Sequence, residues 1–117
     1  MRKHILIIVF LIALISGCAS SKTDFKVLEP ENWTTTVEAT ADDIISNMSK
    51  KEIKRIRNTK KEDLIQYHFG WGTEIRNYYG LWYNQKLRED ACGKDCHPDS
   101  ASMIIIEKVW EKLQNKG

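Results

Sequence analysis

The stretch from Leu64 to Trp82, LIQYHFGWGTEIRNYYGLW, decides the fold. It holds six aromatic residues and a histidine, with three glycines between them. Aromatic side chains bury large apolar areas, whereas a glycine inside a helix costs about 1 kcal/mol relative to alanine. We therefore expect this stretch at the centre of a small helical domain. Gly70 and Gly72 either break the helix or let another helix approach, and Gly80 ends it.

Residues that can cap helices precede the apolar stretches on the N-terminal side of this segment. Thr36 is followed by apolar residues at three- and four-residue spacing that extend to Met48, which predicts a capped helix. The tetrapeptides 49–52 (SKKE) and 59–62 (TKKE) both have the capping-box sequence. Each is expected to begin a further helix.

The C-terminal side of the segment also reads as helix. A polar stretch from Asn84 to Ala91 predicts a short helix, and the step His97-Pro98-Asp99-Ser100 predicts the start of a longer one. The last helix carries an apolar stripe at helical spacing, formed by Met103, Ile106, Val109, Trp110 and Leu113. No strand pattern stands out, so we predict an all-α single domain of four to six short helices.

The N-terminus has the features of a bacterial lipoprotein signal. Met-Arg-Lys-His precedes eleven apolar residues, 5–15, and then Ser16-Gly17-Cys18. Eleven residues span about 16 Å as a helix, which is too short for a hydrocarbon core of about 30 Å. The site resembles a lipobox, and this resemblance implies that Cys18 receives acyl chains and becomes the first mature residue. An ordinary cleaved signal is the alternative.

The charge balance excludes a general nucleic-acid binder. The chain has 18 basic and 16 acidic residues, and removal of residues 1–17 takes away Arg2 and Lys3 and leaves a near-neutral chain. A nucleic-acid binder needs a clustered basic face. The basic run between Lys50 and Lys61 predicts a solvated helix face, with contact to anionic lipid headgroups as the alternative.

Three regions follow: a signal peptide at 1–17, a tether at 18–31 that is polar and aperiodic, and a helical domain at 32–117. We expect the mature protein to be attached to a membrane of the cell envelope through Cys18. Because Ala19 follows Cys18, resemblance to sorted lipoproteins implies the periplasmic face of the outer membrane in a Gram-negative cell.

The other two cysteines predict a disulfide. Cys92 and Cys96 flank a three-residue loop, and an exported domain folds in an oxidising compartment. A metal site formed with His97 is the alternative, but it lacks a fourth ligand and its spacing fits no zinc motif. We predict no metal and no cofactor.

Polar and aromatic residues in the central segment and before the last helix form a candidate binding or structural cluster: His68, Glu74, Arg76, Asn77, Trp82, His97 and Asp99. We interpret Arg76 as a buried structural cation that pairs with an acid such as Asp99 or Glu74. No Ser-His-Asp set, phosphate-binding loop or HExxH motif is present, so we assign no catalytic residue.

Three ordered motifs carry a resemblance to a family: Asp63–Gly72 (DLIQYHFGWG), Glu74–Trp82 (EIRNYYGLW), and His97–Ser102 leading into Ile105–Trp110. The chain resembles an uncharacterised bacterial domain family over about residues 33–115. The resemblance implies a compact helical fold and a shared cluster around His68, Arg76, Asn77, Trp82, His97 and Asp99. It implies no activity.

Three functions remain open. The leading hypothesis is a non-enzymatic, membrane-tethered module that binds a protein of the envelope. The second is a hydrolase-like enzyme acting on envelope substrates through His97, Asp99 and Glu74, which requires that these side chains meet in one open pocket. The third is a structural envelope lipoprotein that self-associates.

Overall fold

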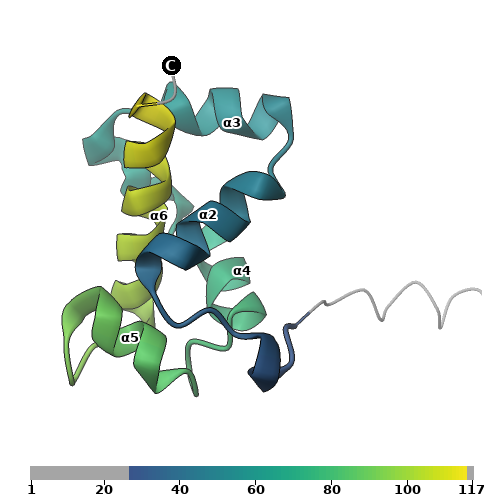
Figure 1. Ribbon diagram of the computed structural model, residues 1–117. Coiled ribbons are helices and arrows are strands. Elements are labelled where there is room, and N and C mark those ends of the chain that lie inside the picture. Colours follow the sequence, from purple (N-terminus) through teal and green to yellow (C-terminus); the bar gives the residue numbers. More distant parts are fainter. Residues whose placement is uncertain (1–26, 116–117) are drawn as a thin grey trace, which may run out of the picture.

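A computed structural model describes residues 27–115. Its elements are η1 (Pro30–Asn32), α2 (Val37–Ser46), α3 (Lys50–Arg57), η2 (Lys61–Tyr67), α4 (Trp71–Tyr78), α5 (Gln85–Cys92) and α6 (Pro98–Asn115), where η marks a 3-10 helix (Figure 1). All regular structure in this range is helical, which confirms the predicted fold class. The predicted signal peptide and Cys18 lie outside the described residues. No helix between residues 27 and 115 has the length and apolar character that a membrane crossing requires.

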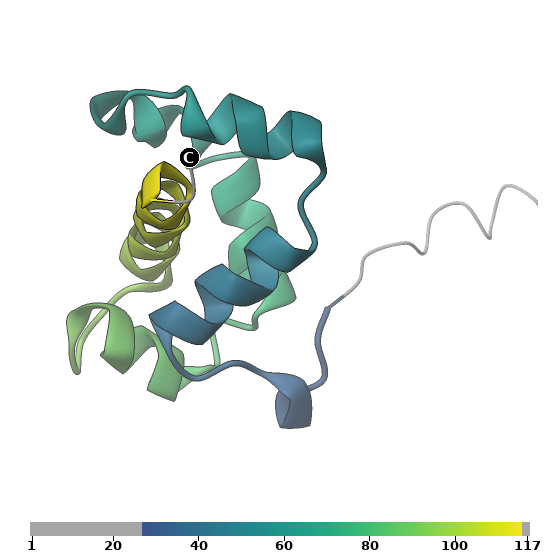
Figure 2. The same cartoon turned by 45° about the horizontal axis from the view of Figure 1, so that its top comes forward.

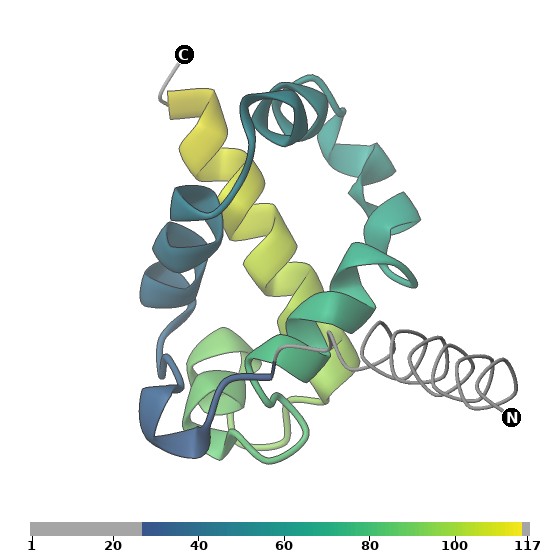
Figure 3. The same ribbon diagram turned by 90° about the vertical axis from the view of Figure 1, so that its right-hand side faces the viewer.

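Helix α6 is the central element of the domain. It contacts α2, α3, α4, α5 and η2, and Figure 3 shows it crossing the molecule diagonally with α2 on one side and α4 on the other. Figure 2 views α6 more nearly end-on, with α3 above it and α5 below. The prediction that the 64–82 segment is the centre is therefore wrong. With 18 residues, α6 is more than twice as long as α4, so it reaches every neighbour.

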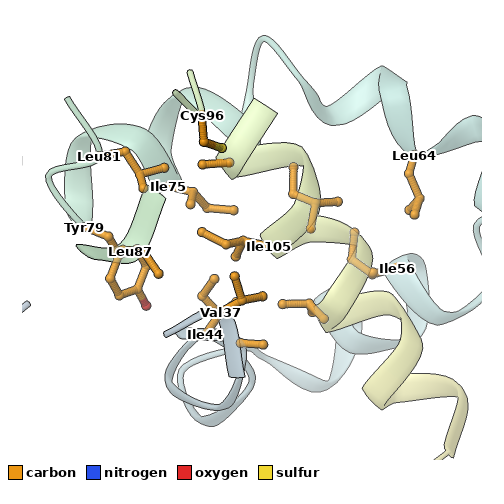
Figure 4. Close-up of a cluster of buried hydrophobic side chains, with 14 of the residues drawn as sticks. Val37, Ile44, Ile56, Leu64, Ile75, Tyr79, Leu81, Leu87, Cys96 and Ile105 are labelled. Atoms are coloured by element: carbon orange, nitrogen blue, oxygen red, sulfur yellow. The ribbon is translucent and has the colours of Figure 1, made fainter. Parts of the chain in front are cut away.

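The hydrophobic core forms around the buried face of α6 (Figure 4). Ile105, Ile106 and Val109 of α6 are fully enclosed. Side chains of the surrounding elements pack against them, among them Val37, Ile44, Ile56, Leu64, Ile75, Tyr79, Leu81 and Leu87. At about 1.5–3 kcal/mol for each buried aliphatic side chain, this shared core holds helices that are too short to be stable alone.

Two of the predicted helix starts have the expected caps. The Thr36 hydroxyl accepts a hydrogen bond from the amide of Ala39 and begins α2. At α3, the Ser49 hydroxyl accepts from the Glu52 amide at 3.1 Å, and the Glu52 carboxylate accepts from the Ser49 amide at 3.2 Å. The tetrapeptide 49–52 thus forms a complete capping box, as the sequence predicts.

The capping box predicted at 59–62 is absent. Thr59 instead donates its hydroxyl to the carbonyl of Arg55 at 2.8 Å and shares a hydrogen bond with the Tyr67 hydroxyl at 2.9 Å. The hydroxyl thus binds the end of α3 rather than the start of the next helix. The following element is the 3-10 helix η2, which begins without a side-chain cap.

The aromatic residues of the 64–82 segment differ in burial: Tyr67, Trp71 and Tyr78 pack partly buried against the core. Tyr79 is 3% exposed, but Phe69 is 85% and Trp82 53% exposed. Gly70 lies between η2 and α4 and interrupts the helix there, so Phe69 does not continue the buried face of α4. Gly80 has a φ of +62° and ends α4, as predicted.

The first described residues form a strap across the α4–α5 turn. The Leu28 amide donates to the carbonyl of Tyr78 at 3.0 Å, and the Trp33 indole donates to the carbonyl of Leu28 at 3.0 Å. The Trp33 ring lies where a Cβ on Gly80 would be. The predicted tether at 18–31 therefore overlaps the folded domain from Leu28 onward.

Candidate functional site

Arg76 joins α4, α6 and the end of η2 from a buried position, with 7% of the residue exposed. Its Nη1 donates to the Ser102 hydroxyl at 2.9 Å. Its Nη2 donates to the Thr73 hydroxyl at 2.8 Å and to the His68 carbonyl at 3.3 Å. Its Nε lies 3.4 Å from Oδ1 of Asp99. The predicted acidic partner is thus Asp99. We call these five residues the Arg76 clamp, and its full set of internal partners indicates a structural role.

Gly72 provides the space that the clamp occupies. A Cβ at this position would lie 3.1 Å from Nη1 of Arg76 and 3.3 Å from the carbonyl oxygen of Tyr67. The Ser102 hydroxyl of α6 would be 3.7 Å away. The prediction that this glycine admits a neighbouring helix is correct in part, because α6 does approach here. The tighter restraint is the guanidinium.

His97 and Trp82 form the exposed edge of the clamp. Their rings meet edge to face at 5.4 Å, and the His97 side chain is 57% exposed. Nδ1 of His97 accepts a hydrogen bond from the Asp99 amide at 3.0 Å, while the Asp99 carboxylate is 3.8 Å from the same nitrogen. Through the shorter contact, the His97 side chain caps the first turn of α6.

His68 takes part in the Arg76 clamp through its main-chain carbonyl and not through its side chain. Its carbonyl accepts from Arg76, whereas its Nδ1 is buried without a hydrogen-bond partner among the described residues. The imidazole packs edge to face against Phe69 at 4.9 Å between ring centres.

Glu74 and Asn77 lie on a different face of α4. Together with Trp71 and Tyr78, they line an open cleft of about 610 Å³. We call it the α2–α3–α4 cleft, and it is lined by Ile44, Asn47, Met48, Glu52, Trp71, Glu74, Ile75, Asn77, Tyr78 and Tyr79. The candidate residues therefore divide between two places: the clamp with its exposed edge, and the cleft.

Helical geometry explains this division. Positions 71, 74, 75 and 78 share one face of α4 because residues three and four apart are neighbours on a helix. Gly72 and Arg76, also four apart, face α6. The sequence analysis missed the opposite wall, formed by Ile44, Asn47, Met48 and Glu52. The sequence could have indicated this wall, because the apolar stripe of α2 continues to Met48, two residues beyond the end of the helix at Ser46.

The electrostatics of the cleft are acidic. Ser49 hydrogen bonds lower the pKa of Glu52, so this carboxylate is charged at neutral pH. Burial and a 2.6 Å hydrogen bond to Asp43 raise the pKa of Tyr79, so its hydroxyl remains a neutral donor. Glu74 enters none of the ion pairs formed among residues 27–115.

The predicted disulfide is present between α5 and α6. Cys92 and Cys96 are bonded, with their Cα atoms 5.1 Å apart, and Gly93 turns the chain with a φ of +94°. Within residues 27–115, no group of three His, Cys, Asp or Glu side chains is placed to hold a metal ion.

Comparison with known families supports the resemblance drawn from the motifs. The model of a family described as a domain of unknown function, DUF6794, matches residues 33–113. This match covers most of the chain, so the protein belongs to that family. No curated protein and no solved structure matches the chain.

Proposed function

Because the DUF6794 family carries no assigned activity, we propose a function from the geometry. The protein is a lipid-anchored, non-enzymatic module of the cell envelope that binds another protein through the α2–α3–α4 cleft. Cys18 at the end of a lipoprotein-like signal supports the anchor. By the same resemblance, the anchor places the domain on the periplasmic face of the outer membrane if the cell is Gram-negative.

The observation that carries this proposal is the composition of the cleft. Aromatic rings of Trp71 and Tyr78 stand beside Glu74 in an open hollow of about 610 Å³. Clustered aromatic side chains next to polar groups supply much of the binding energy at protein interfaces. Residues of α2, α3 and α4 and of the α2–α3 connection form this surface, and the three helices are each packed against α6.

The hydrolase alternative loses its geometric support. It needs His97, Asp99 and Glu74 in one pocket. Glu74 lines the cleft, whereas Asp99 pairs with Arg76, which extends toward α6 from another face of α4. The structural alternative predicts self-association, which sedimentation of the full chain measures directly.

An envelope cross-linking experiment tests the proposal. We expect a chemical cross-linker to join the anchored protein to one specific partner in intact cells. Asn77→Arg places a bulky side chain in the cleft and should reduce this adduct at least about fivefold, because one disrupted contact of about 1 kcal/mol corresponds to that factor. Asn115→Arg is the matched control, since Asn115 is exposed at the end of α6, and it should leave the adduct unchanged.

The anchor is tested separately. Cells fed a labelled fatty acid should label the wild-type protein and not a Cys18→Ser variant. Equal labelling of the two proteins would contradict the lipid anchor at Cys18. An adduct that persists in Asn77→Arg would contradict partner binding through the cleft.

A further inference from the structure

We infer that the α2–α3–α4 cleft receives a lysine or arginine side chain from the partner protein. This inference rests on the proposed function and specifies the chemistry of the contact. It follows from the charge, the aromatic rings and the apolar walls of the cleft.

Charge is the first argument. Two carboxylates, Glu52 and Glu74, line the cleft, and no lysine or arginine does. A third carboxylate, Asp43, is 2.6 Å from the hydroxyl of the lining residue Tyr79. The adjoining helix α3 carries basic residues, but none of them belongs to the lining. Glu74 therefore offers a negative charge that no ion pair among the described residues neutralises.

The rings are the second argument. Trp71, Tyr78 and Tyr79 line the same hollow, and the faces of aromatic rings attract ammonium and guanidinium groups. A cation placed between such rings and a carboxylate gains from both contacts, and the gain rises as water is displaced.

The apolar walls are the third argument. Ile44, Met48 and Ile75 belong to the lining, and they can pack against the methylene groups of a long basic side chain while its charged end reaches Glu74. An acidic or phosphorylated segment would instead meet the like charge of Glu52 and Glu74.

A sugar is the main competitor, because carbohydrates also stack on aromatic rings and accept amide hydrogen bonds such as those of Asn77. A neutral sugar does not need Glu74 as a charge, however, so the two ligands differ in their dependence on that carboxylate.

The test uses the mature lipid-anchored chain in micelles of an uncharged detergent. The probe is the capped tripeptide Ac-Ala-Arg-Ala-NH2, followed through the amide and indole signals in 1H–15N spectra. We expect saturable shifts at Trp71, Glu74 and Asn77 that weaken severalfold when salt is raised from about 0.05 M to about 0.5 M. The same peptide with Leu or Glu in place of Arg should bind at least about fivefold more weakly.

Matched variants locate the effect. Glu74→Gln keeps the shape of the side chain and should weaken binding of the arginine peptide about fivefold or more. Glu89→Gln, on exposed α5 away from the cleft, should bind as the wild type does. Because Glu74 is exposed, the variant should fold, and its unperturbed spectrum verifies this. Trp71→Leu is a second variant that removes the ring and should also weaken binding.

Two results would overturn the inference: no shifts with the arginine peptide, or equal binding to the wild type and Glu74→Gln. Preferential binding of a trimer of N-acetylglucosamine that ignores Glu74→Gln would assign the cleft to sugars instead. If the cross-linked adduct in cells depends on the cleft but the arginine peptide does not bind, only this inference fails. If the peptide binds but no cleft-dependent adduct forms in cells, only the proposed function fails.

Discussion

At the scale of single residues, Arg76 is buried and takes its polar partners from within the domain. The sequence indicated that Arg76 is buried and paired with an acid, because a guanidinium among aromatic and apolar residues needs internal partners. The structure shows Asp99, Ser102 and Thr73 in that role. Ser102 lies 26 residues away from Arg76, so no local pattern identifies it. The sequence analysis placed Glu74 and Arg76 in one candidate cluster. They lie two positions apart on α4, so Glu74 faces the cleft and Arg76 faces α6.

Gly70 and Gly72, two of the three glycines of the 64–82 segment, give a matched test at this scale. Gly72→Ala should lower the free energy of unfolding by about 1–3 kcal/mol, because the new methyl group crowds Arg76 and the carbonyl of Tyr67. Gly70→Ala should change it by no more than about 0.5 kcal/mol, since a Cβ at Gly70 meets nothing within 4 Å. Urea denaturation of both variants measures the difference. Equal stability would show that the guanidinium does not fill the space beside Gly72.

At the scale of elements, a capping sequence predicted the start of a helix correctly where its hydroxyl had no competing hydrogen-bond partner. Ser49 and Thr36 begin helices as predicted. Thr59 does not, because the end of α3 and the Tyr67 hydroxyl compete for the same side chain. That competition depends on how η2 folds back toward α3, which the tetrapeptide sequence does not contain. Gly70 separates η2 from α4, although the aromatic residues on both sides of it suggest one continuous helix.

The capping box of α3 should contribute measurably to stability. Ser49→Ala removes the hydroxyl that accepts from the Glu52 amide and should cost about 1 kcal/mol. Ser46→Ala removes a hydroxyl that donates to the Asp43 carbonyl on an exposed surface and should cost less than about 0.5 kcal/mol. Thermal and urea unfolding of both variants check this. A larger loss for Ser46→Ala would mean that the box is not what begins α3.

The same box should make stability depend on pH. Ser49 lowers the pKa of Glu52 below its ordinary value of 4.5, so the charged carboxylate stabilises the folded state above that pH. This stabilisation is lost as the pH falls through the lowered pKa. The wild type should therefore exceed Glu52→Gln in stability at pH 7, and the difference should shrink progressively below about pH 4.5. A difference that grows on acidification would contradict this sign.

At the scale of the whole molecule, fold class followed from the sequence and the arrangement did not. Caps and apolar stripes indicated an all-α domain, but which helix lies at the centre depends on contacts between distant segments. The apolar stripe of α6 gave the better indication, since the buried residues of this helix run from Pro98 to Leu113. The cleft was not predicted, because its walls come from α2, α3 and α4 together.

At this scale the proposed function makes one central claim: the α2–α3–α4 cleft is the surface that binds the partner protein. The domain exposes a second aromatic surface, Trp82 at 53% and Tyr83 at 84%, that would be the natural competitor. Trp82 contacts His97 at the edge of the Arg76 clamp, and neither residue belongs to the lining of the cleft. A partner bound there would leave the cleft unoccupied.

Photo-cross-linking in living cells separates the two surfaces most directly. A photoreactive phenylalanine analogue is placed singly at Asn47 at the rim of the cleft, at Tyr83 in the aromatic surface, or at Lys86 on α5, all of which are exposed. We predict an adduct of defined mass from position 47 and none above background from positions 83 and 86. An adduct from position 83 with none from position 47 would show that the cleft is not the recognition surface.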